Sequence, residues 1–392
     1  MGAAAPGLTG PSRRWTDGLA PALAGFLWAR VCVAAGFLVA HLGSGRVALP
    51  DGRLHLTEGL LTWDGSFYRV LATGGYDAAP TEAARFFPLY PAVARMLAPL
   101  ALGREDVVLV VVANLCALAA AMVLWRLALE VLDPDGDGDA VARRSAWMLA
   151  VVPPAFVLAF AYAEGPALLV VSAALLALHR RNWWWAALFG LLAGLVRPVG
   201  VLVVIPAAVE VWRWWRDRPR GDSPATRGTA HGSPAGAAAA LAGPVLGLSG
   251  GLWWIGAVVG DAGAPLRIQR RLRAGFRDPL TRLLEGLWEV ARLDWRDVVN
   301  VAGALVALWL LVVAIRRRQP LGWVLYSAAT VAVALAANNI DSLGRYALLA
   351  VPLVVALAQW SDRRWRTAAV GVVGSAGLVV LTAAALWGRL IP

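Results

Sequence analysis

The chain has 392 residues, of which 59% are hydrophobic and only 16% are charged, and its mean hydropathy is +0.63. Soluble domains carry about 25% charged residues, so this composition excludes an ordinary water-soluble fold. The net charge of +11 comes from 36 arginines without any lysine, and these arginines stand in short clusters at the ends of apolar runs. Such clusters are typical of membrane topology signals and not of a nucleic-acid surface.

Seven apolar runs are long enough for a helix to cross a bilayer, which takes about 20 residues. They are 19–42, 106–132, 236–259, 298–315, 321–339, 343–360 and 367–388. Arg13 and Arg14 precede the first run, which is longer than the apolar core of a signal peptide. We therefore predict a retained first helix that begins in the cytoplasm.

Two further regions, 146–178 and 183–211, each begin and end beside an arginine cluster, so each is predicted to enter the membrane and return. Both are shorter than the roughly 40 residues that two full crossings require. We therefore predict two broken hairpins that turn near Glu164 and at Arg197-Pro198. Non-helical backbone at this depth must be buried in protein or line a wet cavity, so Glu164 and Arg197 are expected to face a polar cavity.

These segments predict an all-α, polytopic membrane bundle of about eleven segments, with a single domain over residues 1–392. The arginine clusters place the N-terminus in the cytoplasm and the C-terminus outside. They leave 43–105 and 260–297 as outer loops and 212–235 as a cytoplasmic loop. The first outer loop mixes aromatic residues with charges and prolines, which predicts helices lying at the membrane interface.

The strongest local motif opens with Trp63-Asp64-Gly65-Ser66-Phe67-Tyr68 in this first outer loop. It continues with Gly74-Gly75-Tyr76 and then with Phe86-Phe87-Pro88-Leu89-Tyr90-Pro91. The motif places one carboxylate directly after the first crossing, among aromatic side chains that can stack on a sugar. Desolvation raises the pKa of a carboxyl group and makes it a better general base, so Asp64 is a candidate catalytic residue. The alternative is that Asp64 only caps a helix.

This combination of motifs resembles the PIG-V-type mannosyltransferases, which are multispanning enzymes of GPI-anchor assembly with bacterial relatives in the GT-C superfamily. The resemblance covers most of the chain and points to an actinobacterial-type relative. Further similar positions are Tyr162-Ala163-Glu164, Arg197-Pro198-Val199-Gly200, Gln269 after Pro265-Leu266, and Gly344-Arg345-Tyr346. The sequence departs from the family pattern at Ala163, where the family has serine, and at Arg270, where it has an aromatic residue.

The resemblance implies an inverting mannosyltransferase of the plasma membrane that works on the extracytoplasmic face. The donor would be polyprenyl-phosphate-mannose, and the acceptor a hydroxyl of a glycolipid, lipoglycan or protein. Asp64 would be the general base, and arginines would stabilise the leaving phosphate in place of a metal cofactor. The implied substrate-binding residues are Trp63, Tyr68, Tyr76, Phe87, Tyr90, Glu164, Arg197, Gln269, Arg270, Arg345 and Tyr346.

Several alternatives stay open at this point. Glu164 and Arg197 can form a structural ion pair instead of a phosphate site, and Arg345 can pair with Asp341 in a solvated turn. The arginines between 267 and 273 can contact anionic headgroups. A lipid or lipid-linked-sugar transporter also builds its site from broken helices, and a non-catalytic assembly subunit is a third reading.

Overall fold

The structure is a computed structural model that describes residues 14–47, 54–132, 138–217, 233–291, 298–338 and 343–391. All regular structure within these ranges is helical, which confirms the predicted all-α fold class. In chain order the helices are α1 (Thr16–Gly43), α2 (Leu54–Glu58), η1 (Gly59–Leu61), α3 (Asp64–Gly74), η2 (Thr81–Arg85), α4 (Leu89–Leu97), η3 (Ala98–Ala101), α5 (Glu105–Leu132), α6 (Gly138–Val151), η5 (Pro153–Ala159), α7 (Glu164–His179), α8 (Trp183–Val196), η6 (Pro198–Val203), α9 (Val204–Arg216), α10 (Pro234–Val259), α11 (Ala264–Leu272), α12 (Pro279–Ala291), α13 (Val298–Arg316), α14 (Leu321–Leu335), α15 (Leu343–Leu348), α16 (Pro352–Trp360) and α17 (Arg364–Leu386).

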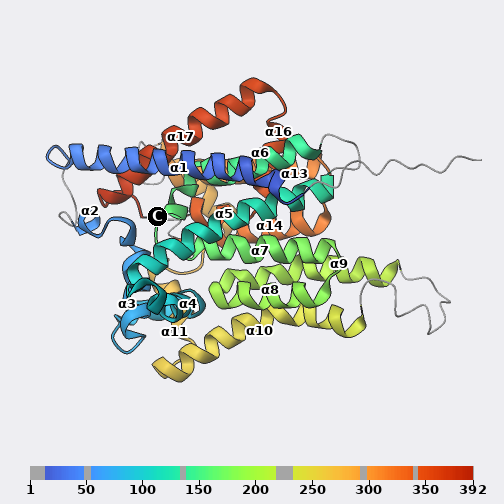
Figure 1. Cartoon of the computed structure of the whole chain (residues 1–392), viewed down its shortest axis with the longest axis horizontal. Coiled ribbons are helices and arrows are strands. Elements are labelled where there is room, and N and C mark those ends of the chain that lie inside the picture. Colours follow the sequence, from blue (N-terminus) through green and yellow to red (C-terminus); the bar gives the residue numbers. More distant parts are fainter. Residues whose placement is uncertain are drawn as a thin grey trace, which may run out of the picture.

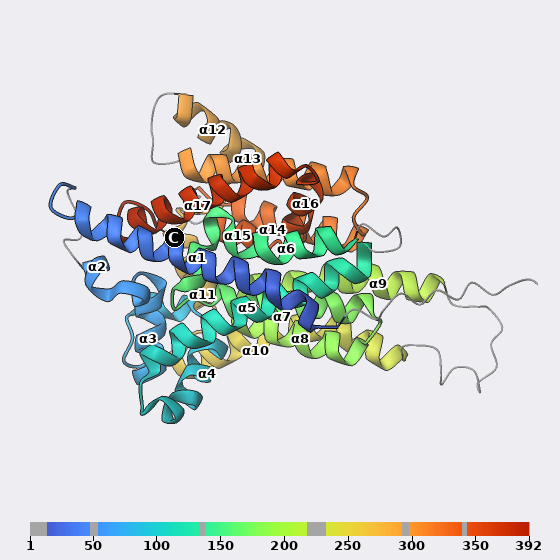
Figure 2. The same ribbon diagram turned by 45° about the horizontal axis from the view of Figure 1, so that its top comes forward.

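Six helical segments in the described ranges are long and apolar enough to cross a membrane, and a seventh results if the bent pair α6 and η5 is one span. The six are α1, α5, the continuous η6–α9 segment, α10, α13 and α17. The chain is thus a multi-pass membrane protein, while the number of eleven segments and their orientation stay predictions. The long helices run side by side, and α2, α3, α4 and α11 gather at one end of the bundle (Figures 1 and 2).

The run 343–360, predicted to cross as one helix, is divided in the structure. Its first part, α15, ends at Leu348, and α16 begins at Pro352 after a short turn. Proline fits the first turn of a helix but lacks the amide hydrogen that would continue a preceding one, so the break falls where Pro352 stands. The break leaves Arg345 on a short helix near the outer-loop helices and not in the middle of a span.

Both predicted turning points are breaks between helices: residues 160–163 separate η5 from α7, and Arg197 separates α8 from η6. Prolines end the neighbouring helices α6 and α8. Pro153 and Pro154 end α6, and η5 leaves it at an angle of 70°. Pro198 ends α8, and Arg197 before it has extended backbone (φ −152°, ψ 144°), as the residue before a proline prefers. The breaks place Glu164 at the start of α7 and Arg197 at the end of α8.

Close glycine contacts hold α10 against α8. A Cβ atom added at Gly247 would lie 2.1 Å from the carbonyl oxygen of Leu191, and one at Gly194 would lie 2.6 Å from the amide nitrogen of Leu248. Helices in membranes associate through such small-residue interfaces because lipid provides no hydrophobic drive between them. One turn further along α10, Gly251 leaves room for the ring of Phe87, whose atoms a Cβ there would meet at 2.4 Å.

Residues 54–104, which belong to the predicted first outer loop, form a layer of short helices over one end of the bundle (Figure 1). The hydroxyl of Tyr90 on α4 donates a hydrogen bond of 2.7 Å to the carbonyl of Leu109 on α5. Tyr68 of α3 packs edge-on against both Tyr90 and Phe86. The predicted loop helices are therefore present, and these aromatic contacts fix α3 relative to the membrane helices.

We expect Gly247→Ala to lower the thermal stability of the purified protein in detergent, because its methyl group would overlap the backbone of α8. Overpacking of this kind costs about 1–3 kcal/mol. Gly250→Ala is the matched control, since its Cβ would meet only the side chain of Leu195 at 3.7 Å. The measurement is the unfolding midpoint of both variants, and equal midpoints would contradict glycine-dependent packing of α10 on α8.

Candidate active site

Asp64 is presented by a strained turn. Trp63, directly before it, has φ 56° and ψ −121°, a conformation that favours glycine, in a turn closed by a 3.1 Å hydrogen bond from the Gly65 amide to the Thr62 carbonyl. Backbone of this kind costs about 1–3 kcal/mol and persists where other contacts hold it. Here the Trp63 indole donates to the carbonyl of Ala385 at 2.9 Å and stacks on the ring of His55.

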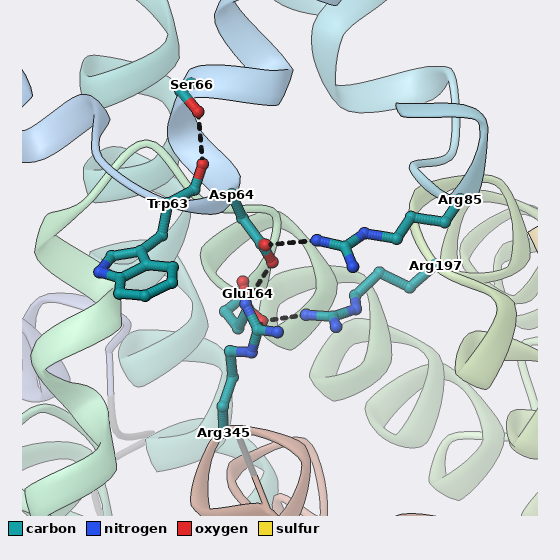
Figure 3. A network of polar contacts seen from close by, with 7 residues as sticks. All are labelled: Trp63, Asp64, Ser66, Arg85, Glu164, Arg197 and Arg345. Atoms are coloured by element: carbon teal, nitrogen blue, oxygen red, sulfur yellow. Dashed lines mark hydrogen bonds and ion pairs between the residues drawn. The ribbon is translucent and has the colours of Figure 1, made fainter. Parts of the chain in front are cut away.

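The Asp64 carboxylate meets two arginines. Arg85 Nη2 lies 3.3 Å from Asp64 Oδ1, and Arg345 donates a hydrogen bond to Asp64 Oδ2 (Figure 3). Asp64 is the first residue of α3, and the N-cap residue before it, Trp63, makes no capping hydrogen bond with its side chain. Burial by itself raises the pKa of Asp64, but the charges of Arg345 and Arg85 outweigh it and hold the pKa below its ordinary value. This corrects the expected raised pKa.

Glu164 joins the same cluster from behind. Its side chain is 1% exposed and forms an ion pair with Arg197, and its Oε1 lies 3.2 Å from Arg345 Nε. Arg345 thereby bridges the two carboxylates (Figure 3). The predicted partnership of Glu164 with Arg197 is present, and Asp341, the alternative partner of Arg345, lies outside the described residues.

The first outer loop and the first broken hairpin are tied together beside this cluster. The amide of Ala161 donates a 2.9 Å hydrogen bond to the carbonyl of Leu60. Gly65 lies against Ala161, and a Cβ at Gly65 would be 3.4 Å from the methyl group of Ala161. The segments that carry Asp64 and Glu164 are therefore in direct contact, although 100 residues separate them in the sequence.

A cavity of about 510 Å³ opens next to the cluster. At its polar side the ring of Tyr346 lies between guanidinium groups, 4.5 Å from that of Arg273, 5.1 Å from that of Arg197 and 5.7 Å from that of Arg345. The rest of the wall is mainly apolar. The lining residues there include Val199, Val201 and Leu202 of η6, Leu248 and Leu252 of α10, and Leu266 and Leu272 of α11.

Most of the predicted site residues line this cavity or adjoin it. Those that line it are Asp64, Tyr68, Phe87, Arg197, Gln269, Arg345 and Tyr346. Glu164 lies behind them and contacts Arg197 and Arg345. The structure thus brings together residues from the first outer loop, both broken hairpins, α11 and α15.

Besides Glu164, four predicted substrate-binding residues do not line the cavity. Trp63 anchors the turn before Asp64, Tyr76 donates a 2.6 Å hydrogen bond to the Phe86 carbonyl, and Tyr90 holds α4 to α5. Arg270 is exposed on the surface of α11. Trp63, Tyr76 and Tyr90 therefore hold together the layer of helices that carries Asp64. Arg270 lies on the face of α11 that points away from the cavity.

Arg85 and Arg273 line the cavity but were not among the predicted site residues. Arg273 follows Gln269 by four residues, and this spacing puts both on one helical face, from which Arg270 is rotated away. Helical periodicity was thus a usable signal for Arg273. Arg85 stands directly before the Phe86-Phe87 pair, but nothing in its local pattern separates it from an ordinary loop arginine.

In the part of the chain that the structure describes, no group of three or more His, Cys, Asp or Glu side chains is arranged to hold a metal ion. The two carboxylates at the cavity are paired with arginines instead. Independence from metal stays a prediction.

No protein-family profile matches the sequence, and no curated protein matches it. Solved structures of an oligosaccharyltransferase from Archaeoglobus fulgidus are similar to the chain. Its complex with zinc and sulfate shares 16% identity at a TM-score of 0.42, over 92% of this chain and 53% of that one. The complex of AglB from the same organism with an inhibitory peptide and a dolichol-phosphate shares 14% identity at a TM-score of 0.42, over 93% of this chain and 56% of that one.

The same enzyme tethered to an acceptor peptide shares 14% identity at a TM-score of 0.43, over 92% of this chain and 55% of that one. The chain therefore spans little more than half the length of these archaeal proteins. At this identity a likeness concerns the fold alone, and membership of the PIG-V-type family stays a prediction. Any functional conclusion has to come from the geometry of the cavity.

We expect Glu164→Gln to destabilise the protein strongly, because it leaves Arg197 and Arg345 buried with one fewer counterion. Removing one partner of a buried ion pair typically costs about 3–5 kcal/mol. Glu58→Gln is the control, because Glu58 lies 3.7 Å from Arg69, whose side chain is 40% exposed. Unfolding midpoints in detergent should fall for Glu164→Gln and stay near the parent value for Glu58→Gln, and a similar loss in both would contradict the structural role of Glu164.

Proposed function

We propose that this chain is an inverting membrane glycosyltransferase that moves mannose from polyprenyl-phosphate-mannose to an acceptor hydroxyl, with Asp64 as general base. The observation that carries the proposal is the meeting of one accessible carboxylate and four arginines in a single cavity with an apolar wall. The arginines are Arg85, Arg197, Arg273 and Arg345. Mannose as the sugar rests on the family resemblance of the motifs around Asp64.

The chemistry needs one base and a stabilised leaving group. The acceptor oxygen attacks the sugar C1 from the face opposite the phosphate, its proton passes to Asp64, and the bond between C1 and the phosphate oxygen breaks. The products are the glycosylated acceptor and a polyprenyl phosphate. Inversion follows because a single displacement occurs at C1 and no covalent sugar–enzyme bond forms.

The charge of the cavity fits the leaving group. Four arginines stand against the two carboxylates Asp64 and Glu164, which leaves two positive charges without an acidic partner among them. A sugar phosphodiester carries one negative charge, and the polyprenyl phosphate that leaves approaches two. Positive groups placed before the reaction therefore stabilise the transition state more than the bound donor, which is the condition for catalysis.

The apolar wall offers a place for the start of the prenyl chain. Val199 and Leu202 on η6 face the same cavity as Leu248 and Leu252 on α10, beside the arginine Arg197. A donor with its phosphate at the arginines would lay its first isoprene units along these side chains. The proposed acceptor is a glycolipid, lipoglycan or protein at the extracytoplasmic face of the plasma membrane.

Asp64→Asn should reduce sugar transfer by about 10²–10⁴-fold, the contribution typical of general acid–base catalysis. The assay follows labelled mannose from a polyprenyl-phosphate donor in membranes that contain the variant. Asp77→Asn is the matched control, because Asp77 is an exposed residue of the same outer loop and does not line the cavity. Full turnover by Asp64→Asn would remove this residue from the mechanism.

Sugar transfer should persist in the presence of a chelator such as EDTA, because arginines already neutralise both carboxylates and face the position of the phosphate. The measurement compares initial rates before and after chelation, and after addition of Mg²⁺ or Mn²⁺. A rate that falls on chelation and returns with either ion would show that the phosphate needs a metal.

A lipid or lipid-linked-sugar transporter is the competing function, since carriers also place charged residues at broken helices. The two readings differ in what happens to the lipid. Purified protein in liposomes that moves a labelled lipid across the bilayer and leaves its headgroup intact would favour the transporter, whereas loss of the sugar to an acceptor favours the transferase.

A further inference from the structure

The ion pairs at the cavity fall into a buried group and a more exposed group. Glu164 is 1% exposed, and its partners Arg197 and Arg345 have side chains that are 11% and 8% exposed. These three residues lie on interrupted helical segments, and their side chains are enclosed by protein. Separating them would leave charges in a medium of low dielectric constant, so this group is held in place.

Asp64 and Arg85 form the more exposed group, at the open side of the cavity. Their side chains are 15% and 23% exposed, and the atoms Arg85 Nη2 and Asp64 Oδ1 are 3.3 Å apart. Within the described residues Asp64 is the only carboxylate at ion-pair distance from Arg85. The Arg85 guanidinium also lies over the rings of Phe67 and Phe86, at 5.4 Å and 4.7 Å, which can support it in more than one rotamer.

A donor phosphate that enters this cavity would be an anionic partner for Arg85, as the Asp64 carboxylate is. Carboxylate and phosphate oxygens both match the planar guanidinium fork, so the two anions compete for one cation. Given the proposed function, we propose that Arg85 exchanges partners: it holds Asp64 in the empty site and moves to the donor phosphate on binding, which leaves Asp64 with Arg345 alone and makes it a better base.

The exchange would couple basicity to donor binding. Asp64 is faced by Arg85 of η2, by Arg345 of α15 and by Arg197 after α8, and by Glu164 and Tyr162 from the break before α7. While the nearest two arginines hold it, the pKa of Asp64 stays low and the carboxylate is a poor base. Loss of Arg85 to a phosphate, together with the new negative charge, raises that pKa when the lipid phosphate is bound.

The test is a double-mutant cycle on binding of polyprenyl phosphate to the purified full-length protein in nanodiscs, with polyprenol as the uncharged comparison lipid. Asp64→Asn removes the competing anion with little change in shape, so it should tighten binding about tenfold although it slows transfer. Arg85→Gln should weaken binding. In the Arg85→Gln background Asp64→Asn should lose most of its gain, because the contested cation is absent.

The matched control is the pair Arg104 and Asp106 at the start of α5, whose atoms Arg104 Nη2 and Asp106 Oδ2 are 3.1 Å apart and which does not line the cavity. Asp106→Asn and Arg104→Gln should leave the affinity for polyprenyl phosphate unchanged. Unchanged or weaker binding by Asp64→Asn, or the same gain with and without Arg85, would overturn the exchange.

The binding cycle is read without sugar transfer, so it separates the exchange from the proposed function. A wild-type protein that binds polyprenyl phosphate and shows the expected cycle, yet transfers no sugar to any acceptor, would refute the transferase and leave the exchange standing. Normal transfer with no coupling between Asp64 and Arg85 would do the reverse. Arg85→Lys serves as a second variant that retains the charge and should recover part of the lost affinity.

Discussion

The rest of the site depends on a buried carboxylate, Glu164, that pairs with two arginines. The Glu164 side chain is almost fully buried. It contacts the guanidinium groups of Arg197 and Arg345, which lie on two other segments of the chain. Charges at membrane depth are retained only when they are paired or lie in a wet cavity. The pairing therefore allows three broken segments to converge at one point, and the cavity exists because none of them continues as a helix through that point.

The sequence could predict this convergence because its causes are local. Pro198 ends α8 directly after Arg197, and a charged residue beside such a break needs a partner or water. The placement of Asp64 was likewise readable from its position after the first crossing. These features depend on covalent geometry and on the cost of burying charge, which act on a few neighbouring residues.

What the sequence could not reveal depends on distant contacts. The pKa of Asp64 was expected to rise with burial, yet two arginines far along the chain or across a loop lower it. Tyr76 and Tyr90 have the composition of a sugar-stacking surface, but their hydroxyls bond to backbone carbonyls that no motif identifies. The family resemblance points to Arg270, which follows Gln269, whereas the helical period puts Arg273 on the same face as Gln269.

The four arginines of the cavity have a chemical property that lysines would not share. A guanidinium keeps its proton at every pH that a membrane protein meets, so these groups supply positive charge and no buffering capacity. A proton collected by Asp64 cannot be handed to Arg85 or Arg345, and Glu164 is closed off behind them. Under the proposed mechanism the proton would therefore leave through the open side of the cavity, so the acidity on that side would govern how quickly the carboxylate is ready again.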